Sequence, residues 1–201
     1  MKRVIQIVLT VAIVVLGYML VESIMAPIRF QEEQSRRYDR TIERLRNIRT
    51  AQLAYRSAHG EFTGSFDTLI DFVLNDSFSV VRQIGDPDDE DAVERGDVYR
   101  DTVKVSVRDS IFRPGFDVEQ LRYVPFTDRE EEFELGAGEV MTGSGLEVKV
   151  FEARVHNDVL LHGLDRQQVI NLNDQRRRRD QFPGLKVGDL ERPTNHAGNW
   201  E

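Results

Sequence analysis

Residues 1–30 read MKRVIQIVLTVAIVVLGYMLVESIMAPIRF, and this apolar stretch decides how the remainder of the chain is interpreted. A helix rises about 1.5 Å per residue, so residues 4–25 extend over roughly 30 Å, which matches the hydrocarbon thickness of a bilayer. The stretch therefore predicts a transmembrane anchor over residues 1–27. Two alternatives are a cleaved secretory signal, whose apolar core is normally shorter, and a core helix, which needs apolar neighbours on every side.

The charges on either side of the span predict its orientation. Lys2 and Arg3 precede the apolar stretch, and the positive-inside rule places such an end in the cytoplasm. Arg29, Arg36 and Arg37 follow the span and reduce the charge difference between its two sides. We therefore expect a single-pass protein of a bacterial inner membrane, with a cytoplasmic N-terminus and a periplasmic C-terminal domain.

The composition restricts the possible functions. The 201 residues carry a formal net charge of −8 and include no cysteine. Without cysteine the chain has no disulfides, thiol nucleophiles or thiolate metal sites. The acidic balance argues against nucleic-acid binding, which needs a basic field. The length outside the anchor fits one modest domain, which we place at residues 61–201.

Residues 28–60 are predicted to form an amphipathic stalk helix. They contain no proline, and their one glycine is Gly60, a residue type that commonly ends a helix. Pro27 is compatible with a kinked but continuous helix, so we expect the stalk to continue from the anchor; a separate first helix of the domain is the alternative. Apolar and aromatic side chains recur every three or four residues, and this face is available to a sheet or to another copy of the chain. The partner-binding candidates on it are Tyr38, Ile42, Leu45, Ile48 and Tyr55.

The exported domain is predicted to combine a short helix with an antiparallel sheet. Ser65 is placed to cap a helix over residues 66–74. Residues 132–141 and 146–155 are predicted to form a hairpin around the turn sequence TGSG. The shorter predicted strands are residues 78–84, 103–107 and 121–125. The expected fold class is α+β: an N-terminal transmembrane helix continuing into a long amphipathic helix that packs on a small antiparallel β-sheet.

Residues 46–69, RNIRTAQLAYRSAHGEFTGSFDTL, resemble the superfamily of type IV pilins and type II secretion pseudopilins. In that superfamily a membrane helix runs into the domain and ends near a Tyr-x-x-x-x-Gly-x-[Tyr/Phe] phrase, followed by a short helix. The matching positions are Tyr55, Gly60, Phe62 and Leu69. The resemblance implies a pilin-like fold and a structural role in a secretion or motility apparatus. The chain lacks the family's prepilin-peptidase site and its Glu at the fifth mature position, which argues against polymerisation into a filament.

The function expected from these features is structural. The first hypothesis is a pilin-like or pseudopilin-like subunit of a bacterial envelope assembly. The second is a non-polymeric, membrane-tethered periplasmic module that recruits or stabilises a partner complex. We predict no enzymatic activity, no catalytic residue and no cofactor. The expected partners are the membrane, other envelope proteins and further copies of the chain, and neither nucleic acid nor a small-molecule substrate is expected.

Three further segments are candidates for binding. The acidic run at residues 86–91 contains oxygen ligands suited to calcium. Its spacing differs from that of an EF-hand, so a solvated loop is the favoured interpretation. The tetra-arginine is either a solvated segment or a docking patch for an acidic partner. Trp200 is predicted to dock, either on its own sheet or into a partner. The residues concerned are Asp86, Asp88, Asp89 and Asp91 for calcium, and Arg176, Arg177, Arg178 and Arg179 for the patch.

Overall fold

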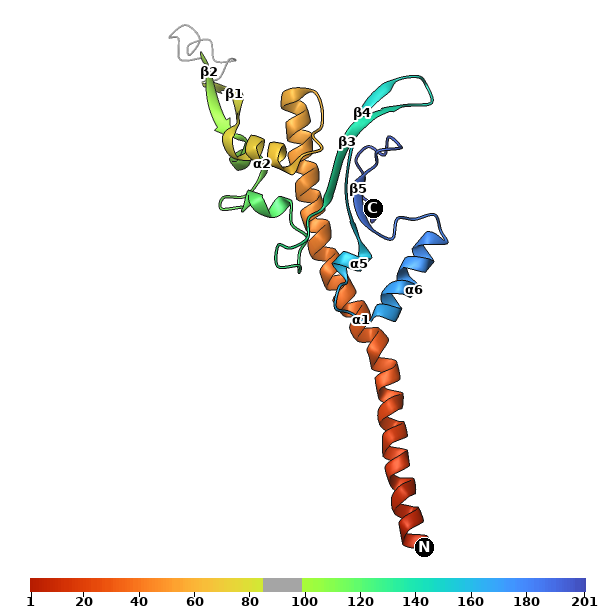
Figure 1. The fold of residues 1–201 in the computed structure, drawn as a ribbon. Helices are drawn as coiled ribbons and strands as arrows, with labels where there is room; N and C mark the ends of the chain where they lie inside the picture. Colours follow the sequence, from red (N-terminus) through yellow and green to blue (C-terminus); the bar gives the residue numbers. More distant parts are fainter. Residues whose placement is uncertain (85–98) are drawn as a thin grey trace. The chain divides into compact units, whose positions relative to one another are not determined.

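A computed structural model describes residues 1–84 and 99–201 (Figure 1). The described chain is α+β, with a long apolar N-terminal helix and small antiparallel sheets. Its contacts define two compact units. Unit 1 comprises Met1–Glu43, Val124–Glu131 and Val155–Leu185, and unit 2 comprises Arg44–Tyr123, Glu132–Arg154 and Lys186–Glu201.

Helix α1 extends from Lys2 to His59 without interruption, with Pro27 inside it (Figure 1). The predicted continuity of anchor and stalk is confirmed. Gly60 ends the helix with a φ of 79°, a left-handed conformation that glycine adopts without a side-chain clash. Among the described residues, α1 is the one helix long and apolar enough to cross a membrane, and its most apolar part is not covered by any other part of the chain.

Unit 2 includes the last part of α1, from Arg44 to His59, and one face of this part is buried. Leu45, Ile48 and Ala51 are fully buried, which shows that the apolar stripe of the stalk faces the core of its own unit. Gln52, also fully buried, donates from Nε2 to the Thr63 carbonyl at 2.6 Å and accepts from the Thr63 amide at 3.2 Å. This reciprocal pair holds the chain that leaves α1 against the helix, because an unpaired buried amide would carry a large desolvation cost.

Helix α2 (Phe66–Asn75) follows, and Ser65 caps it as predicted by accepting a hydrogen bond from the Thr68 amide. Strands β1 (Ser77–Ile84) and β2 (Tyr99–Ser106) then pair antiparallel, which confirms the first two short strands. Strand β2 ends at Ser106, one residue before the predicted end of the second strand, because helix α4 (Val107–Ile111) begins there. The 3₁₀ helix η1 (Val118–Leu121) comes next.

The predicted strand over residues 121–125 is wrong. Leu121 ends η1, and the only strand-like pairing in this stretch is an isolated bridge between Tyr123 and Glu132. Leu121 and Val124 are both buried, and their spacing of three fits a turn of helix rather than the alternation of a strand. Pro125 lacks the amide hydrogen that a strand ladder needs.

The predicted hairpin is confirmed. Strand β3 (Glu134–Met141) pairs antiparallel with β4 (Glu147–His156), with Met141 opposite Glu147 and Glu134 opposite Arg154. The turn is closed by a bond from the Gly145 amide to the Thr142 carbonyl. Strand β5 (Gly184–Gly188) lies on the other side of β4, which gives the order β3-β4-β5.

Unit 1 contains the first part of α1 and two further helices. Helix α5 (Asn157–Leu160) is a single turn, and α6 (Arg166–Arg177) is capped by Asp165, whose carboxylate accepts from the Gln168 amide. The buried apolar part of this unit consists of Phe30, Val124, Val155, Leu160, Leu161, Val169 and Leu185.

Candidate functional site

A chain of side-chain hydrogen bonds connects α1, α5 and α6 within unit 1. The Tyr38 hydroxyl donates to Asn157 Oδ1 at 2.6 Å, Asn157 Nδ2 donates to Asn173 Oδ1 at 2.8 Å, and Asn173 Nδ2 donates to Asp158 Oδ1 at 3.0 Å. Both asparagines are buried. Burial raises the pKa of Tyr38, so its phenol remains a neutral donor. The chain is fully paired, and it fixes how the three helices meet.

Arg37 attaches the end of α5 to α1. Its Nη1 donates to the carbonyls of Leu160 at 3.1 Å and His162 at 2.9 Å, and its Nε donates to Glu33 Oε1 at 2.9 Å. Glu33 also accepts two bonds from Arg36, at 2.7 and 2.8 Å. Charge-assisted bonds of this kind are about twice as strong as neutral ones, so this cluster holds the loop that follows α5.

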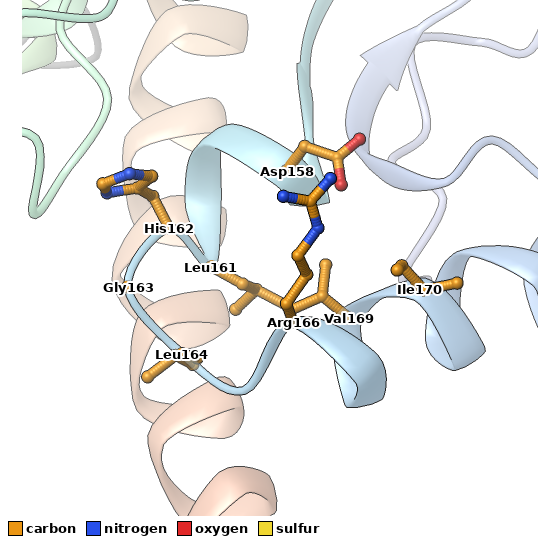
Figure 2. Close-up of a pocket in the computed structure, with 8 residues that line it drawn as sticks. All are labelled: Asp158, Leu161, His162, Gly163, Leu164, Arg166, Val169 and Ile170. Carbon is orange, nitrogen blue, oxygen red and sulfur yellow. The ribbon is translucent and has the colours of Figure 1, made fainter.

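A cavity of about 470 Å³ lies between α5 and α6 (Figure 2). Its buried wall is apolar, since Leu161 and Val169 are almost fully covered. Figure 2 shows the side chain of Arg166 extending toward Asp158 at the rim. The other lining residues are His162, Gly163, Leu164 and Ile170. An apolar wall with one carboxylate, one guanidinium and one imidazole at its edge suits an apolar group that carries a polar end.

Among the described residues, no group of three or more histidine, cysteine, aspartate or glutamate side chains is arranged to hold a metal ion. The calcium candidates Asp86, Asp88, Asp89 and Asp91 lie outside the described residues.

The predicted partner-binding residues of α1 lie in two different environments. Tyr38 and Ile42 belong to unit 1 and are half-buried, whereas Leu45 and Ile48 are fully buried in unit 2. Leu45 and Ile48 are thus covered by their own chain, and they offer no surface to a partner. Tyr55 is half-buried and stacks on His59 with ring centroids 4.2 Å apart.

The tetra-arginine divides into one structural residue and three exposed ones. Arg176 is half-buried, donates to the Gly184 carbonyl at 2.8 Å, and places its guanidinium 5.7 Å from the centroid of the Tyr38 ring. Arg177, Arg178 and Arg179 are exposed. The predicted docking patch is therefore limited to these three side chains.

The C-terminal segment 193–201 pairs with β5. Gly198 forms a β-bridge with Val187, and the Asn199 amide donates to the Lys186 carbonyl at 3.0 Å. Trp200 is half-buried beside Gly198. The segment therefore docks on its own chain, and a role of Trp200 in binding a partner stays a prediction.

The C-terminal segment is held by Arg49 of α1 and by the rings of Phe62, which follows α1, and Phe151 of β4. Arg49 Nη1 donates to the carboxylate of Glu201 at 2.8 Å and to the His196 carbonyl at 3.2 Å. The His196 ring lies 4.9 Å from the ring of Phe62 and 5.4 Å from that of Phe151. Burial lowers the pKa of His196, and Arg56 and Arg49 lower it further, so a neutral imidazole is favoured there.

Sequence reasoning missed the residues that build the cavity in Figure 2. The available signals were weak: Asn173 interrupts an apolar pattern around Val169 and Leu172, and Asp165 is a good N-cap residue. Comparisons with protein-family models, with curated proteins and with solved structures gave no match.

Replacing Glu33 with glutamine is expected to lower stability in a pH-dependent way. Hydrogen bonds from Arg36 and then Arg37 lower the pKa of Glu33 from 4.5 to about 2. A carboxylate with a lowered pKa stabilises the fold above its unfolded pKa and loses this contribution as the pH falls through its folded pKa. The melting temperature of Glu33→Gln should therefore lie furthest below that of the wild type above about pH 4.5, and the difference should shrink toward pH 2.

The matched control for this prediction is Glu32→Gln, because Glu32 is the exposed neighbour on the same turn. Thermal unfolding of the two variants and the wild type in nanodiscs, followed by circular dichroism between pH 7 and 2, measures the difference. A deficit that does not change with pH would contradict the ion-pair explanation.

Proposed function

We propose that this chain is a single-pass, membrane-anchored structural subunit of a bacterial envelope assembly, with no chemistry of its own. The proposal rests on one observation: α1 is a single uninterrupted helix whose first part is exposed and whose second part packs in a folded unit. Its first part is apolar on all sides and exposed, and its second part is the buried wall of unit 2. A helix that is apolar all round needs lipid or protein around it. Such a helix links a folded domain directly to a bilayer.

Lys2 and Arg3 support a cytoplasmic N-terminus and a domain in the periplasm. In this orientation the domain is available to periplasmic proteins and to the periplasmic parts of other membrane proteins. The exposed Arg177, Arg178 and Arg179 would give an acidic partner a charged contact.

A non-polymeric accessory module is the form that we favour. Glu22 is the first acidic residue of the chain, and its carboxylate pairs with Arg29 of the same helix at 3.3 Å. The chain lacks the Glu at the fifth mature position that pairs with a neighbouring subunit in the pilin superfamily. A carboxylate already paired within its own helix gives a neighbouring copy less to bind.

A pilin-like subunit is the second candidate. It is supported by the uninterrupted passage of α1 into the domain and by the sequence around Tyr55, Gly60 and Phe62, where that helix ends. This candidate predicts self-association through the exposed apolar part of α1.

Purification of the tagged full-length protein from its native membrane in mild detergent tests the proposal. Mass spectrometry would give the mass of the N-terminal peptide and the stoichiometry of co-purifying proteins. An intact Met1 with a fixed set of other envelope proteins would support the accessory module. A trimmed N-terminus with ladders of cross-linked copies would support the pilin-like subunit, and a released soluble domain would contradict both forms.

A further inference from the structure

The C-terminal segment 193–201 is joined to β5 by a short pairing. It forms an isolated β-bridge and a few hydrogen bonds of 3.0 to 3.1 Å rather than a continuous ladder, and Figure 1 marks the C-terminus beside β5. A short pairing at a chain end opens at a smaller free-energy cost than global unfolding. The bridge joins Val187 to Gly198, and the hydrogen bonds join Gly188 to Ala197 and Lys186 to Asn199.

The docked conformation of this segment carries two local costs. Asn195 and His196 have φ angles of 52° and 61°, in the left-handed region that residues with a side chain adopt at a cost. Thr194 Oγ1 and Trp200 Nε1 are buried, and neither has a hydrogen-bond partner among the described residues. Both costs disappear when the segment moves into water, which brings the docked and detached forms closer in free energy.

The His196 ring is the ionisable group at the centre of the docked segment. Besides its contacts with Phe62 and Phe151, its Nε2 lies 3.5 Å from Arg56 Nη1. A guanidinium is only a donor, so this contact is a hydrogen bond only while Nε2 has no proton. Protonation replaces the bond with repulsion between two cations, and Arg49, which donates to the His196 carbonyl, adds a third positive charge.

The nearby carboxylates are already engaged by other groups. Glu201 accepts from Arg49 at 2.8 Å. Asp189, which lines a cavity of about 270 Å³ together with His196 and Arg56, accepts from Lys186 Nζ at 2.8 Å and from two backbone amides. The other lining residues, none of them ionisable, are Val148, Val150, Pro193, Thr194 and Asn195. A charged imidazole at this place therefore faces two arginines and no carboxylate that is free to balance it.

We propose that the C-terminal segment is an acid-sensitive cover of β5, which protonation of His196 detaches from the sheet. Burial, followed by Arg56 and Arg49, lowers the pKa of the docked His196 below its ordinary value of 6.5. In the detached segment the imidazole is in water and binds a proton more readily. Docking is therefore favoured above about pH 6.5 and weakens as the pH falls toward the lowered pKa of the docked form.

Detachment leaves the backbone groups of Lys186 and Gly188 that faced the segment without their partners. An uncovered strand edge of this kind is a template for pairing with an extended strand of another chain. This acid-sensitive contact lies within unit 2, and it does not depend on the proposed function.

The emission of Trp200, the one tryptophan of the chain, measures detachment. The full-length protein in nanodiscs would be brought from pH 7.5 to pH 5, with the emission maximum and the quenching by acrylamide recorded at each step. Asp189 and Glu201 stay ionised over this range, since their pKa values are lowered from 3.8 and 4.5. The variants are His196→Gln, which removes the titratable ring, and the matched control His59→Gln, at an exposed histidine of the same unit.

In the wild type and in His59→Gln, acid should shift the Trp200 emission to longer wavelength and increase acrylamide quenching, and a return to pH 7.5 should reverse both changes. In His196→Gln neither quantity should depend on pH. Arg56→Gln should show a smaller change than the wild type, because the docked imidazole then binds a proton more readily.

A wild-type emission that stays constant between pH 7.5 and 5 would overturn the proposal, and so would an undiminished pH response in His196→Gln. If His196→Gln is already detached at pH 7.5, Arg56→Gln decides, and a pH response as large as that of the wild type would overturn the proposal.

Discussion

Replacing both Val8 and Val14 with arginine is expected to move the full-length protein out of the membrane. An arginine at the centre of a spanning helix opposes insertion by about 2.5–3.5 kcal/mol and one nearer its end by less, so the pair opposes insertion by at most about 5–7 kcal/mol. The two valine side chains are 63% and 66% exposed and touch little else of the chain, so the substitution leaves the folded domain unchanged. Carbonate extraction of membranes, followed by immunoblotting of pellet and supernatant, measures the shift.

Met141→Arg combined with Leu146→Arg is the matched control. These residues flank the β3–β4 turn and are 70% and 64% exposed, so the control exposes as much new charge outside the span. The control should remain in the carbonate-resistant pellet. If the Val8 and Val14 variant also remained there, the exposed apolar part of α1 would not be the anchor.

The features predicted correctly from the sequence are those with local causes. The continuity of α1 follows from an unbroken helical pattern that ends at Gly60, and the hairpin follows from the glycine-rich turn between two alternating segments. The cap at Ser65 is a contact over three residues. Each signal lies within a few residues of the structure that it determines.

The features that sequence reasoning missed depend on contacts between distant residues. Asn173 looks like an interruption of an apolar helix until Asn157, 16 residues away, is seen to bond it. Arg37 looks like one more charge on the stalk, but its acceptors are the backbone carbonyls of Leu160 and His162. A backbone acceptor carries no information about the side chain at its position, so this attachment had no sequence signature.

Phe151→Ala is expected to lower the free energy of unfolding by about 3–5 kcal/mol, the usual cost of deleting a fully buried aromatic side chain. Phe151 is 0% exposed and lies on β4, the central strand of its sheet. Its ring lies 4.9 Å from the ring of Phe62, in the loop that follows α1. The substitution leaves a cavity where the end of the helix and the sheet meet. Urea unfolding of the full-length protein in nanodiscs, followed by the emission of Trp200, measures the loss.

Trp200 is a suitable reporter because it is the one tryptophan of the chain and belongs to the same unit as Phe151. His196 stacks on Phe151 and lies only four residues before Trp200, so the cavity loosens the C-terminal segment as well. The variant should therefore show a red-shifted Trp200 emission even without urea. Met141→Ala, at a side chain 70% exposed, should change stability by less than about 0.5 kcal/mol. A Phe151→Ala protein as stable as this control would show that the helix end, the sheet and the segment do not share one core.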